Sequence, residues 1–546
     1  MRYSQLKDTP MHTPAVRDRR LVTAMLAAFL VIAGPGVVVR ASAETLIAAT
    51  DAGPVEGLVT PTAHEFLGIP YAAAPVGPLR WQPPQPHAAW PTPVDATAFG
   101  DHCPQIASPF GLATTTEDCL FLNVYTPHRK AVPALDLRRR RPVMVWIHGG
   151  AFQVGESDEY DPTKLVEDGD VVVVTTNYRL GALGFLAHPA LTAESPDHVS
   201  GNYGLLDQQF ALQWVQRNIA AFGGDPHRVT ILGESAGGMS VHAQMVSPLA
   251  AGLFHRAIIQ SGALFSQPTL ATAETQGSAV ATALGCSDQS ASCLRAASVD
   301  QILANQGTAL TSSSPVIDGH VLPQPLLHAF KNGDFHRVPV VEGSNHDEMR
   351  LFVALQIELV SGPLTADQYP DAIASFLGVP PAVVPLLIAR YPLANYASPG
   401  LALSALSTDA AFACNALAAT HALSPWVRTY AYEFNDANAP QVFLPPVSFP
   451  YGAAHASEIQ YLFGLPNQVG APPLDADQQR LSDAMVRYWT RVARTGKPGA
   501  ARAPRWPRFD ASDGILSLGA PSPVVESAAE FALDHQCAFW NPLLGN

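Results

Sequence analysis

A glycine-flanked serine at the junction of a strand and a helix constrains the fold of this chain most strongly. Gly233-Glu-Ser-Ala-Gly237 directly follows the β-branched run Val229–Leu232 and precedes a helical stretch, Met239–Val246. So tight a turn requires glycines on both sides of the serine. The pattern predicts that Ser235 projects from a strand end at a helix N-terminus, where the amide of Ala236 can bind a developing negative charge.

Short β-branched runs alternate with helical patterns along the chain, which is typical of a sheet crossed by helices. A helix is expected over Leu205–Ala221, and the stretches 270–325 and 362–411 look mainly helical. These patterns predict an α/β-hydrolase fold, in which a central, mostly parallel sheet is flanked by helices. The other predicted strands are Val143–Ile147, Val171–Thr175, Ala257–Ile259, Val338–Val341 and a half-exposed strand, Arg428–Phe434.

Composition bounds the domain count and the partners. The 546 residues are 47% hydrophobic and only 14% charged, and no linker or repeat divides them, so one large domain is expected over 44–546. The net charge is −14, and removing residues 1–43, with six basic and two acidic residues, leaves −18. Such a chain repels phosphate backbones and anionic lipid, so we expect no nucleic-acid partner.

The N-terminus has the pattern of a secretory signal peptide. Basic residues up to Arg20 precede an uncharged run, Leu21–Val39, and the small-residue sequence Ala41-Ser-Ala43. The alternative is a retained membrane anchor, but Gly34-Pro-Gly36 interrupts the apolar run. We therefore predict a signal peptide over 1–43, cleavage before Glu44, a secreted or periplasmic protein, no stable membrane anchor and no second segment able to span a membrane.

Six cysteines follow the predicted signal peptide. An even number in an exported chain favours disulfides, although the sequence alone does not choose among their pairings. The chain contains neither a Cys-x-x-Cys pair nor a His-Glu-x-x-His motif. We therefore expect no metal site and no cofactor.

A serine hydroxyl needs a base to become a nucleophile, and that base needs a carboxylate to hold its tautomer. In the α/β-hydrolase fold these groups follow the serine in the order acid, then histidine. His455 lies in a small-residue loop, 451–458, and Glu348 follows the predicted strand 338–341. Residue patterns alone leave alternatives open, with Asp347 as a rival acid and three rival bases. The rival bases are His346, His421 and His535.

A second donor loop is expected after the strand Val143–Ile147. His148-Gly149-Gly150-Ala151 stands where this fold places its other oxyanion loop, and glycines let the backbone amides approach a substrate oxygen. His148 itself is interpreted as a structural residue that orients this loop.

Several longer motifs resemble those of the type-B carboxylesterases, a family that also includes cholinesterases and the larger fungal lipases. The resemblance runs from Glu44 to the end of the chain. The motifs are Phe66-Leu-Gly-Ile-Pro-Tyr71, Leu79-Arg80-Trp81, Glu117-Asp-Cys119-Leu-Phe-Leu-Asn123, Ile147-His-Gly-Gly150, Asn177-Tyr-Arg-Leu-Gly181, Phe222-Gly-Gly-Asp-Pro226, Gly233-Glu-Ser-Ala-Gly-Gly238 and Cys537-Ala-Phe-Trp-Asn541.

The resemblance implies a role for each candidate residue in two-step ester hydrolysis. Ser235 falls at the nucleophile, Glu348 at the acid and His455 at the base. The oxyanion hole falls at Gly149, Gly150 and Ala236, while Glu234 and Ser261 lie close by as supporting residues. In one departure, Met349 follows the acid where the family usually has glycine, so the loop geometry there is expected to differ.

The resemblance also implies structural pairs. The implied disulfides are Cys103–Cys119, Cys286–Cys293 and Cys414–Cys537. Four charged residues in framework motifs are interpreted as buried ion-pairing residues, namely Glu117, Asp118, Arg179 and Asp207.

The substrate expected from these features is a short or moderately bulky soluble ester. The loop between Cys103 and Cys119 holds fifteen residues, too few for the helical lid of the family's lipases. It also lacks the tryptophan by which cholinesterases bind a quaternary ammonium, because its only aromatic residue is Phe110. The alternatives are a lipase, a specialised natural-product esterase or a non-catalytic adhesion protein, and we expect a monomer or homodimer.

Overall fold

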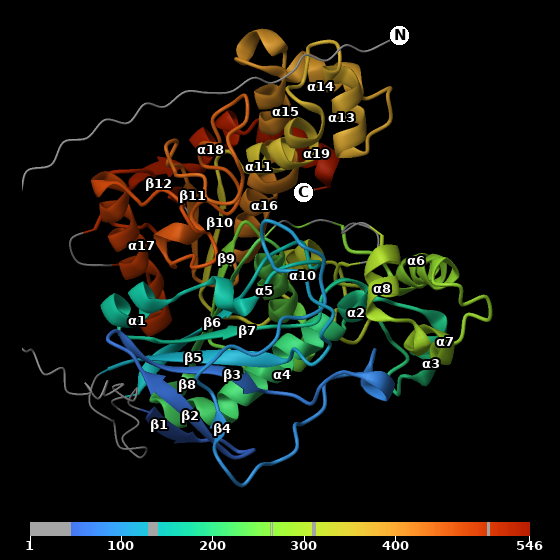
Figure 1. Ribbon diagram of the computed structural model, residues 1–546. Coiled ribbons are helices and arrows are strands. Elements are labelled where there is room, and N and C mark those ends of the chain that lie inside the picture. The colour runs from blue at the N-terminus through green and yellow to red at the C-terminus, as the bar shows by residue number, and fades with distance from the viewer. Residues whose placement is uncertain are drawn as a thin grey trace, which may run out of the picture. The chain divides into compact units, whose positions relative to one another are not determined.

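A thirteen-stranded mixed sheet runs through the part of the chain that the structure describes (Figure 1). The computed structural model describes residues 45–128, 140–262, 264, 266–307, 313–499, 503–510 and 512–545. The predicted signal peptide lies outside the described residues and stays a prediction. The strands are β1 Thr45–Ala49, β2 Pro54–Val59, β3 Ala63–Pro70, β4 Val94–Asp95, β5 Phe121–Pro127, β6 Arg141–Ile147, β7 Val172–Thr176, β8 Gly224–Glu234, β9 Arg256–Gln260, β10 Val340–Asn345, β11 Thr429–Phe434, β12 Gly514–Leu518 and β13 Val524–Ser527.

The sheet is parallel in its centre and antiparallel toward both edges. Its order is β1-β2-β3-β5-β7-β6-β8-β9-β10-β11-β12-β13, with β4 paired to β2. All neighbours from β7 to β12 pair in parallel. Because Gly233 of β8 pairs with both Ile147 and Ile259, the carboxyl ends of β6, β8 and β9 meet at one edge of the sheet. β10 ends at the same edge, since its Gly343 pairs with Gln260.

Helices cover the sheet and form a further layer beyond it. The helices are α1 Thr163–Gly169, α2 Gly181–Phe185, α3 Pro189–Glu194, α4 Tyr203–Asn218, α5 Ala236–Val246, α6 Leu270–Ala283, α7 Ala291–Ala296, α8 Val299–Asn305, α10 Leu326–Asn332, α11 Met349–Val353, α12 Leu359–Ser361, α13 Tyr369–Leu377, α14 Val384–Arg390, α15 Pro399–Thr408, α16 Cys414–Leu423, α17 Ala476–Thr495, α18 Ala528–Asp534 and α19 Cys537–Leu544. Two π-helical turns, η6 (Ala354–Glu358) and η8 (Asp409–Ala413), interrupt the helices near α11 and α15.

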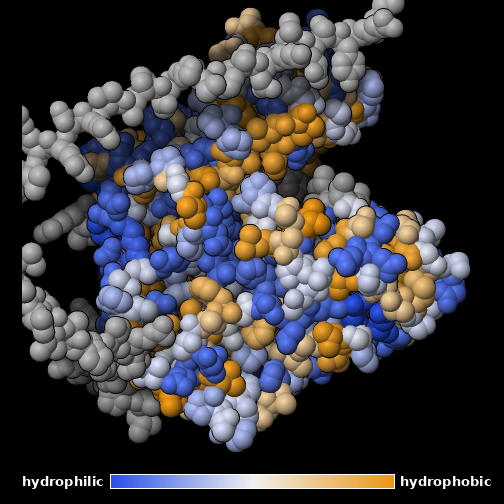
Figure 2. Space-filling model, in the orientation of Figure 1, coloured by the Kyte–Doolittle hydropathy of each residue, from blue (hydrophilic) through white to orange (hydrophobic). Residues whose placement is uncertain are grey.

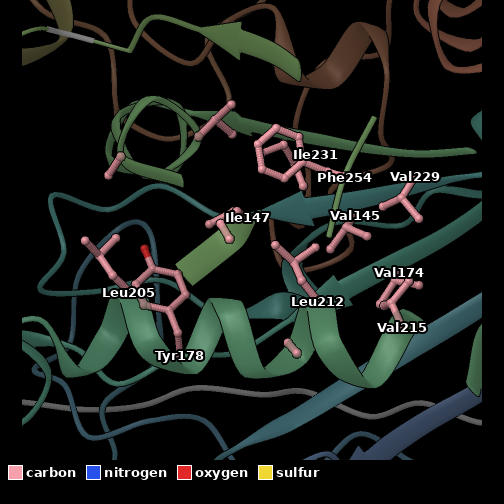
Figure 3. Close-up of a cluster of buried hydrophobic side chains, with 14 of the residues drawn as sticks. Val145, Ile147, Val174, Tyr178, Leu205, Leu212, Val215, Val229, Ile231 and Phe254 are labelled. Atoms are coloured by element: carbon pink, nitrogen blue, oxygen red, sulfur yellow. The ribbon is translucent and has the colours of Figure 1, made fainter. Parts of the chain in front are cut away.

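Both faces of the central strands are buried, so their sequences are apolar without alternation. Val145 and Ile147 of β6 pack in one cluster with Leu212 of α4 (Figure 3). Met144 and Trp146 of the same strand face the opposite layer, in a cluster that includes residues of α17. Full burial of each such side chain contributes about 1.5–3 kcal/mol to the free energy of unfolding.

Most of the predicted strands are present, but β11 differs from the prediction. We expected it to be half-exposed because polar and apolar residues alternate in Arg428–Phe434. All six residues of β11 are instead buried, because the strand lies between β10 and β12 and is covered on both faces. Glu433 of this strand is satisfied inside the protein, because its Oε1 lies 2.7 Å from Nε2 of buried His535.

One stretch of the described chain is long and apolar enough to span a membrane by length and composition. It covers Pro399–Leu423, through α15, η8 and α16. The expectation that no second segment meets this test was therefore wrong. Most of this stretch is buried, and it packs in a third core cluster with α11, α13, α14, α18 and α19. Burial in that cluster accounts for its apolar sequence.

Three disulfides join the described elements with the pairing that the family resemblance implies. Cys103 bonds to Cys119, and Cys286 bonds to Cys293 across seven residues. Cys414, at the start of α16, bonds to Cys537, at the start of α19, across 123 residues. This last bond ties the C-terminal helices to the third cluster.

Candidate active site

Ser235 occupies the sharp turn between β8 and α5. Its backbone has φ 58° and ψ −121°, a conformation that costs a non-glycine residue about 1–3 kcal/mol. A Cβ at Gly237 would lie 2.0 Å from the carbonyl oxygen of Ile147, and one at Gly233 would lie 2.5 Å from the backbone of Gly237. The neighbouring glycines are thus required by close backbone contacts, as the sequence predicts.

Hydrogen bonds hold this strained turn in place. The amide of Ser235 donates to the carbonyl of Gln260 at 2.9 Å, and the carbonyl of Ser235 accepts from the amide of Met239 at 2.9 Å. Ala236 is the first residue of α5, so its N–H has no partner four residues back within the helix. The side chain of Ser235 is therefore presented beside a helix N-terminus.

The glycine loop after β6 lies against this turn. A Cβ at Gly149 would come within 3.2 Å of the Ser235 Cβ and 2.8 Å of Glu234 Oε2. Gly150 has φ +95°, and a Cβ there would lie 2.0 Å from the carbonyl oxygen of Val154. Glycine at both positions brings the loop backbone close to Ser235.

His148 holds the loop through its ring and its backbone. Its Nδ1 lies 2.9 Å from the carbonyl oxygen of Gly149, and its own carbonyl accepts from Tyr178 Oη at 2.9 Å. The rings of His148 and Tyr178 stack, with their centroids 4.4 Å apart. Burial lowers the pKa of His148 to about 4, so the ring is neutral and donates through Nδ1. These contacts fit the structural interpretation of His148.

His455 and Glu348 meet although 107 residues separate them. His455 Nδ1 lies 2.5 Å from Glu348 Oε2, and the other oxygen of Glu348 accepts from the amide of Asn345 at 2.8 Å. The backbone amide of His455 also donates to the Glu348 carbonyl at 3.2 Å. A proton on Nδ1 leaves Nε2 of His455 as the hydrogen-bond acceptor.

Nε2 of His455 lies beside the serine turn. It is 3.1 Å from Oε1 of Glu234, the residue before Ser235. Among the described residues, Nε2 has no hydrogen-bond partner. The histidine, the buried carboxylate and the serine turn therefore come together at the carboxyl edge of the sheet.

The rival acid and bases have other partners. Asp347 pairs with Arg350 at 2.7 Å and accepts from the amide of Ala453 at 3.0 Å. His421 is exposed, with its ring edge against Phe509. His346 and His535 each contact two carboxylates.

Charges surround the imidazole of His455. Burial lowers the pKa of His455, but Glu234 and Glu348 outweigh that effect and raise it to about 9. Burial raises the pKa of Glu234 to about 8, although His455 acts in the opposite direction. The ring is also flanked by Phe352 and Phe412, each with its centroid 5.0 Å away.

A match to a family model decides the family of this chain. Residues 44–540 match the carboxylesterase family. The chain belongs to that family. As a carboxylesterase it is a carboxylic ester hydrolase with the α/β-hydrolase fold.

Named relatives and solved structures agree with this assignment. The carboxylesterase is 35% identical to pyrethroid hydrolase Ces2e of Rattus norvegicus over 506 residues, covering 88% of this chain and 86% of the relative. It is 34% identical to fumonisin B1 esterase of Sphingopyxis macrogoltabida over 498 residues, covering 87% and 86%. A solved PNB esterase superposes with a TM-score of 0.74 at 32% identity, covering 90% of this chain and 99% of that one.

Met349 does not disturb the acid loop of this carboxylesterase. It is the first residue of α11, and Glu348 before it has φ −38° and ψ −55°. A right-handed helical conformation needs no glycine, and the amide of Met349 donates to Thr408 Oγ1 at 3.0 Å. The expected change in loop geometry is therefore not required by the missing glycine.

Three buried residues near the site were not assigned from the sequence. Glu458 accepts from Asn345 Nδ2 at 2.7 Å and from Gln260 Nε2 at 3.1 Å. Glu458 lies three residues after His455, which was the available signal. Ser261, which was singled out, has φ 51°, and its buried Oγ has no partner among the described residues.

The framework charges mostly form the expected ion pairs. Arg179 contacts Asp207 at 2.7 Å with both side chains buried. Glu117 pairs with Arg80, which also donates to the carbonyls of Arg295 and Ala297 at the end of α7. The interpretation of Asp118 was wrong, because its side chain is exposed at the end of the Cys103–Cys119 loop.

Proposed function

We propose that Ser235 is the nucleophile of this carboxylesterase, with His455 as its base and Glu348 as the acid. One observation carries the proposal: His455 bonds to buried Glu348 through Nδ1, while its Nε2 lies 3.1 Å from the residue before Ser235. The strained φ of Ser235 also supports it, because such strain is characteristic of a nucleophile elbow.

In the proposed acylation step, Oγ of Ser235 attacks the ester carbonyl while Nε2 of His455 takes its proton. The carboxylate of Glu348 stabilises the imidazolium that forms. The amides of Gly149, Gly150 and Ala236 bind the oxyanion of the tetrahedral intermediate. His455 then returns the proton to the departing alcohol, leaving an acyl group on Ser235.

Water repeats this sequence in the deacylation step. His455 takes a proton from the water as the water oxygen attacks the acyl carbonyl. It then gives this proton to Oγ of Ser235 as the acyl–Oγ bond breaks and the acid leaves. Glu234 and Ser261 act as supporting residues, since Glu234 lies against both His455 and the Gly149 loop.

We propose short or moderately bulky soluble esters as the substrates. The Cys103–Cys119 loop is closed on itself by bridges between Gln105 and Thr114 and between Ser108 and Gly111, so it has no helical lid. The side chain of Gln105 also fixes the loop to the carbonyl of Gly155 at 3.1 Å. A fixed, non-helical loop gives no reason for activation at a lipid surface.

Apolar residues near the site favour substrates with apolar groups. Phe352 and Phe412 flank His455, and the segment that follows Phe352 exposes Leu359 and Val360. Figure 2 shows hydrophobic side chains gathered in the region of α11 on this face of the protein. Relatives include a cocaine esterase and a fumonisin B1 esterase, whose names give cocaine and fumonisin B1 as their substrates.

We also propose that the protein is exported. Three disulfides are typical of proteins from oxidising compartments, and they agree with the predicted signal peptide.

A burst experiment tests the proposed function. The purified protein is mixed with excess p-nitrophenyl butyrate, and nitrophenol release is followed before steady state. The proposal predicts turnover that a fluorophosphonate abolishes by labelling Ser235. Turnover without labelling of Ser235 would contradict the proposal.

A further inference from the structure

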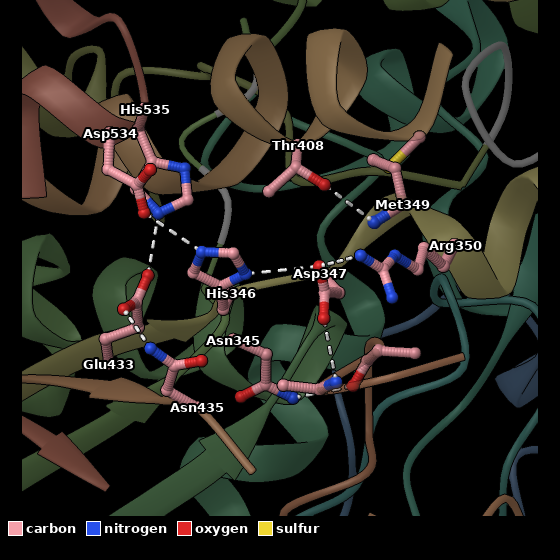
Figure 4. Close-up of polar contacts among 12 residues, drawn as sticks. Asn345, His346, Asp347, Met349, Arg350, Thr408, Glu433, Asn435, Asp534 and His535 are labelled. Carbon is pink, nitrogen blue, oxygen red and sulfur yellow. Dashed lines mark hydrogen bonds and ion pairs between the residues drawn. The ribbon is translucent and has the colours of Figure 1, made fainter. Parts of the chain in front are cut away.

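Two histidines that the proposed mechanism leaves unused lie next to each other near the loop that carries Glu348. His346 follows β10 and His535 follows α18, and their ring centroids are 5.3 Å apart. Figure 4 shows both rings close to Asp534 and Glu433. Asp534 and His535 are neighbours in the sequence, but His346 and Glu433 come from distant parts of the chain, so no sequence motif joins the four residues.

Each ring is held in the same way, with one carboxylate on each nitrogen. For His346, Nδ1 lies 3.1 Å from Asp347 Oδ1 and Nε2 lies 3.0 Å from Asp534 Oδ2. The Nε2 atom of this ring thus faces a carboxylate that its own loop does not supply.

The His535 ring repeats the arrangement. Its Nδ1 lies 2.7 Å from Asp409 Oδ1, and its Nε2 lies 2.7 Å from Glu433 Oε1. Ligand atoms from His346, Asp534 and His535, one from each, lie within 4.8 Å of one another. Two imidazole nitrogens and one carboxylate oxygen therefore gather in one small volume, and Glu433 lies next to them against Nε2 of His535.

We propose that His346, His535, Asp534 and Glu433 bind one divalent transition-metal ion, with zinc as the best fit. Four nitrogen and oxygen ligands at about 2.0–2.2 Å satisfy zinc in a tetrahedral site. The ligand atoms must shift to admit the ion, because the hydrogen-bonded pairs at 2.7 and 3.0 Å are closer than two ligands of one tetrahedral zinc ion. Asp534 is free to do so, because its side chain is 65% exposed at the end of α18.

The outer partners of the two rings support this site. In protein metal sites, the second nitrogen of a histidine ligand usually donates to a carboxylate, which fixes the ring and its tautomer. Asp347 and Asp409 stand in that position for His346 and His535. Both carboxylates are buried, so they hold the rings firmly.

Charge and access also suit a cation. Four carboxylates contact the two imidazoles, so negative charge at this cluster attracts a cation. A cavity of about 340 Å³ is lined by His346, Asp534 and His535. The His346 side chain is 31% exposed, so an ion can reach it from solvent.

A second histidine–carboxylate cluster provides a matched control. His102 contacts Glu156 through Nδ1 and Asp158 through Nε2, each at 3.0 Å. One ring directs its two nitrogens to two different carboxylates there, and no second imidazole belongs to this cluster among the described residues. It therefore lacks the second imidazole of the proposed site.

The test is a calorimetric titration of the metal-stripped protein with zinc chloride. We expect one ion per chain, and we expect Asp534→Asn and His346→Asn to weaken binding at least about tenfold while His102→Asn leaves it unchanged. Circular dichroism verifies that the variants are folded. X-ray absorption of the zinc-loaded protein is expected to show two imidazole ligands.

Three results would overturn the site: no saturable binding by the wild type, equal affinity in Asp534→Asn and wild type, or loss of binding in His102→Asn. Because the test measures zinc binding, its result does not depend on whether the proposed esterase mechanism is correct.

Discussion

Glu234 and His455 face each other across the candidate site, with Glu234 Oε1 3.1 Å from His455 Nε2. The residue before the proposed nucleophile thus presents its carboxylate to the nitrogen that accepts the nucleophile's proton. Both side chains are buried, so little solvent screens their interaction. The charge on Glu234 therefore acts directly on the protonation of the proposed base.

This contact predicts how activity depends on pH. The base must be neutral to work, so kcat/KM falls as pH drops through the His455 pKa. Because Glu234 and Glu348 raise that pKa from 6.5 to about 9, the acidic limb lies above the ordinary imidazole value, which the sequence alone would have suggested. Glu234→Gln removes one of these charges, so its acidic limb is expected at lower pH.

Profiles of kcat/KM against pH for p-nitrophenyl butyrate hydrolysis measure the shift. Ser261→Ala serves as a control, because it changes a nearby buried side chain without changing charge. A limb that stays in place in Glu234→Gln, or moves equally in Ser261→Ala, would contradict the electrostatic explanation.

The two adjacent acids are expected to differ in their effect on catalysis. Glu348→Gln leaves His455 without a charged partner on Nδ1, and the corresponding change in a serine protease lowers kcat by about 10⁴. Asp347→Asn keeps an oxygen for the amide of Ala453, so a loss of less than about tenfold is expected. Steady-state kinetics of both variants compare them, and a more damaging Asp347→Asn would show that the acid is wrongly assigned.

The two disulfides of different span are expected to contribute unequally to stability. Cys414–Cys537 closes 123 residues and Cys286–Cys293 only seven. Loop-closure entropy predicts that replacing the first pair by serine lowers the free energy of unfolding by about 2.5 kcal/mol more than replacing the second pair. Urea unfolding of the two double variants measures the difference. A larger loss for the short loop would mean that native-state contacts outweigh chain entropy.

Substrate length provides a test of the fixed Cys103–Cys119 loop. We expect faster hydrolysis of butyrate esters than of long-chain triglycerides, with no increase in rate as tributyrin passes its solubility limit. Choline butyrate is expected to show no advantage over a neutral butyrate ester, since Phe110 attracts a cation less than tryptophan would. A jump at the solubility limit or a choline preference would refute this substrate class.

Much of this fold is predictable from short stretches of sequence, because the patterns that indicate the elbow and the central strands each lie within a few consecutive residues. The elbow around Ser235 depends on contacts of its own glycines, and the apolar runs of β6 and β8 reflect burial on both faces. The burial of β11 was not predictable in the same way, because it depends on its neighbours in the sheet.

The histidines show what local patterns leave open. Residue patterns alone left His346 and His535 as rivals to His455, together with His421, and the resemblance to the family favoured His455. The structure separates them by long-range contacts: His455 meets Glu348, while the other two face Asp534 and Glu433. His346 and Glu433 are likewise far from His535 in the sequence, so a motif search does not find the proposed metal ligands.

Replacement of the proposed nucleophile tests the central claim most directly. The measurement compares wild type and Ser235→Ala in hydrolysis of p-nitrophenyl butyrate, with fluorophosphonate labelling and peptide mapping of both. We predict that Ser235→Ala folds normally, loses activity by about 10⁴ or more and takes up no label. Retained activity in Ser235→Ala, together with labelling of a different serine, would contradict the account.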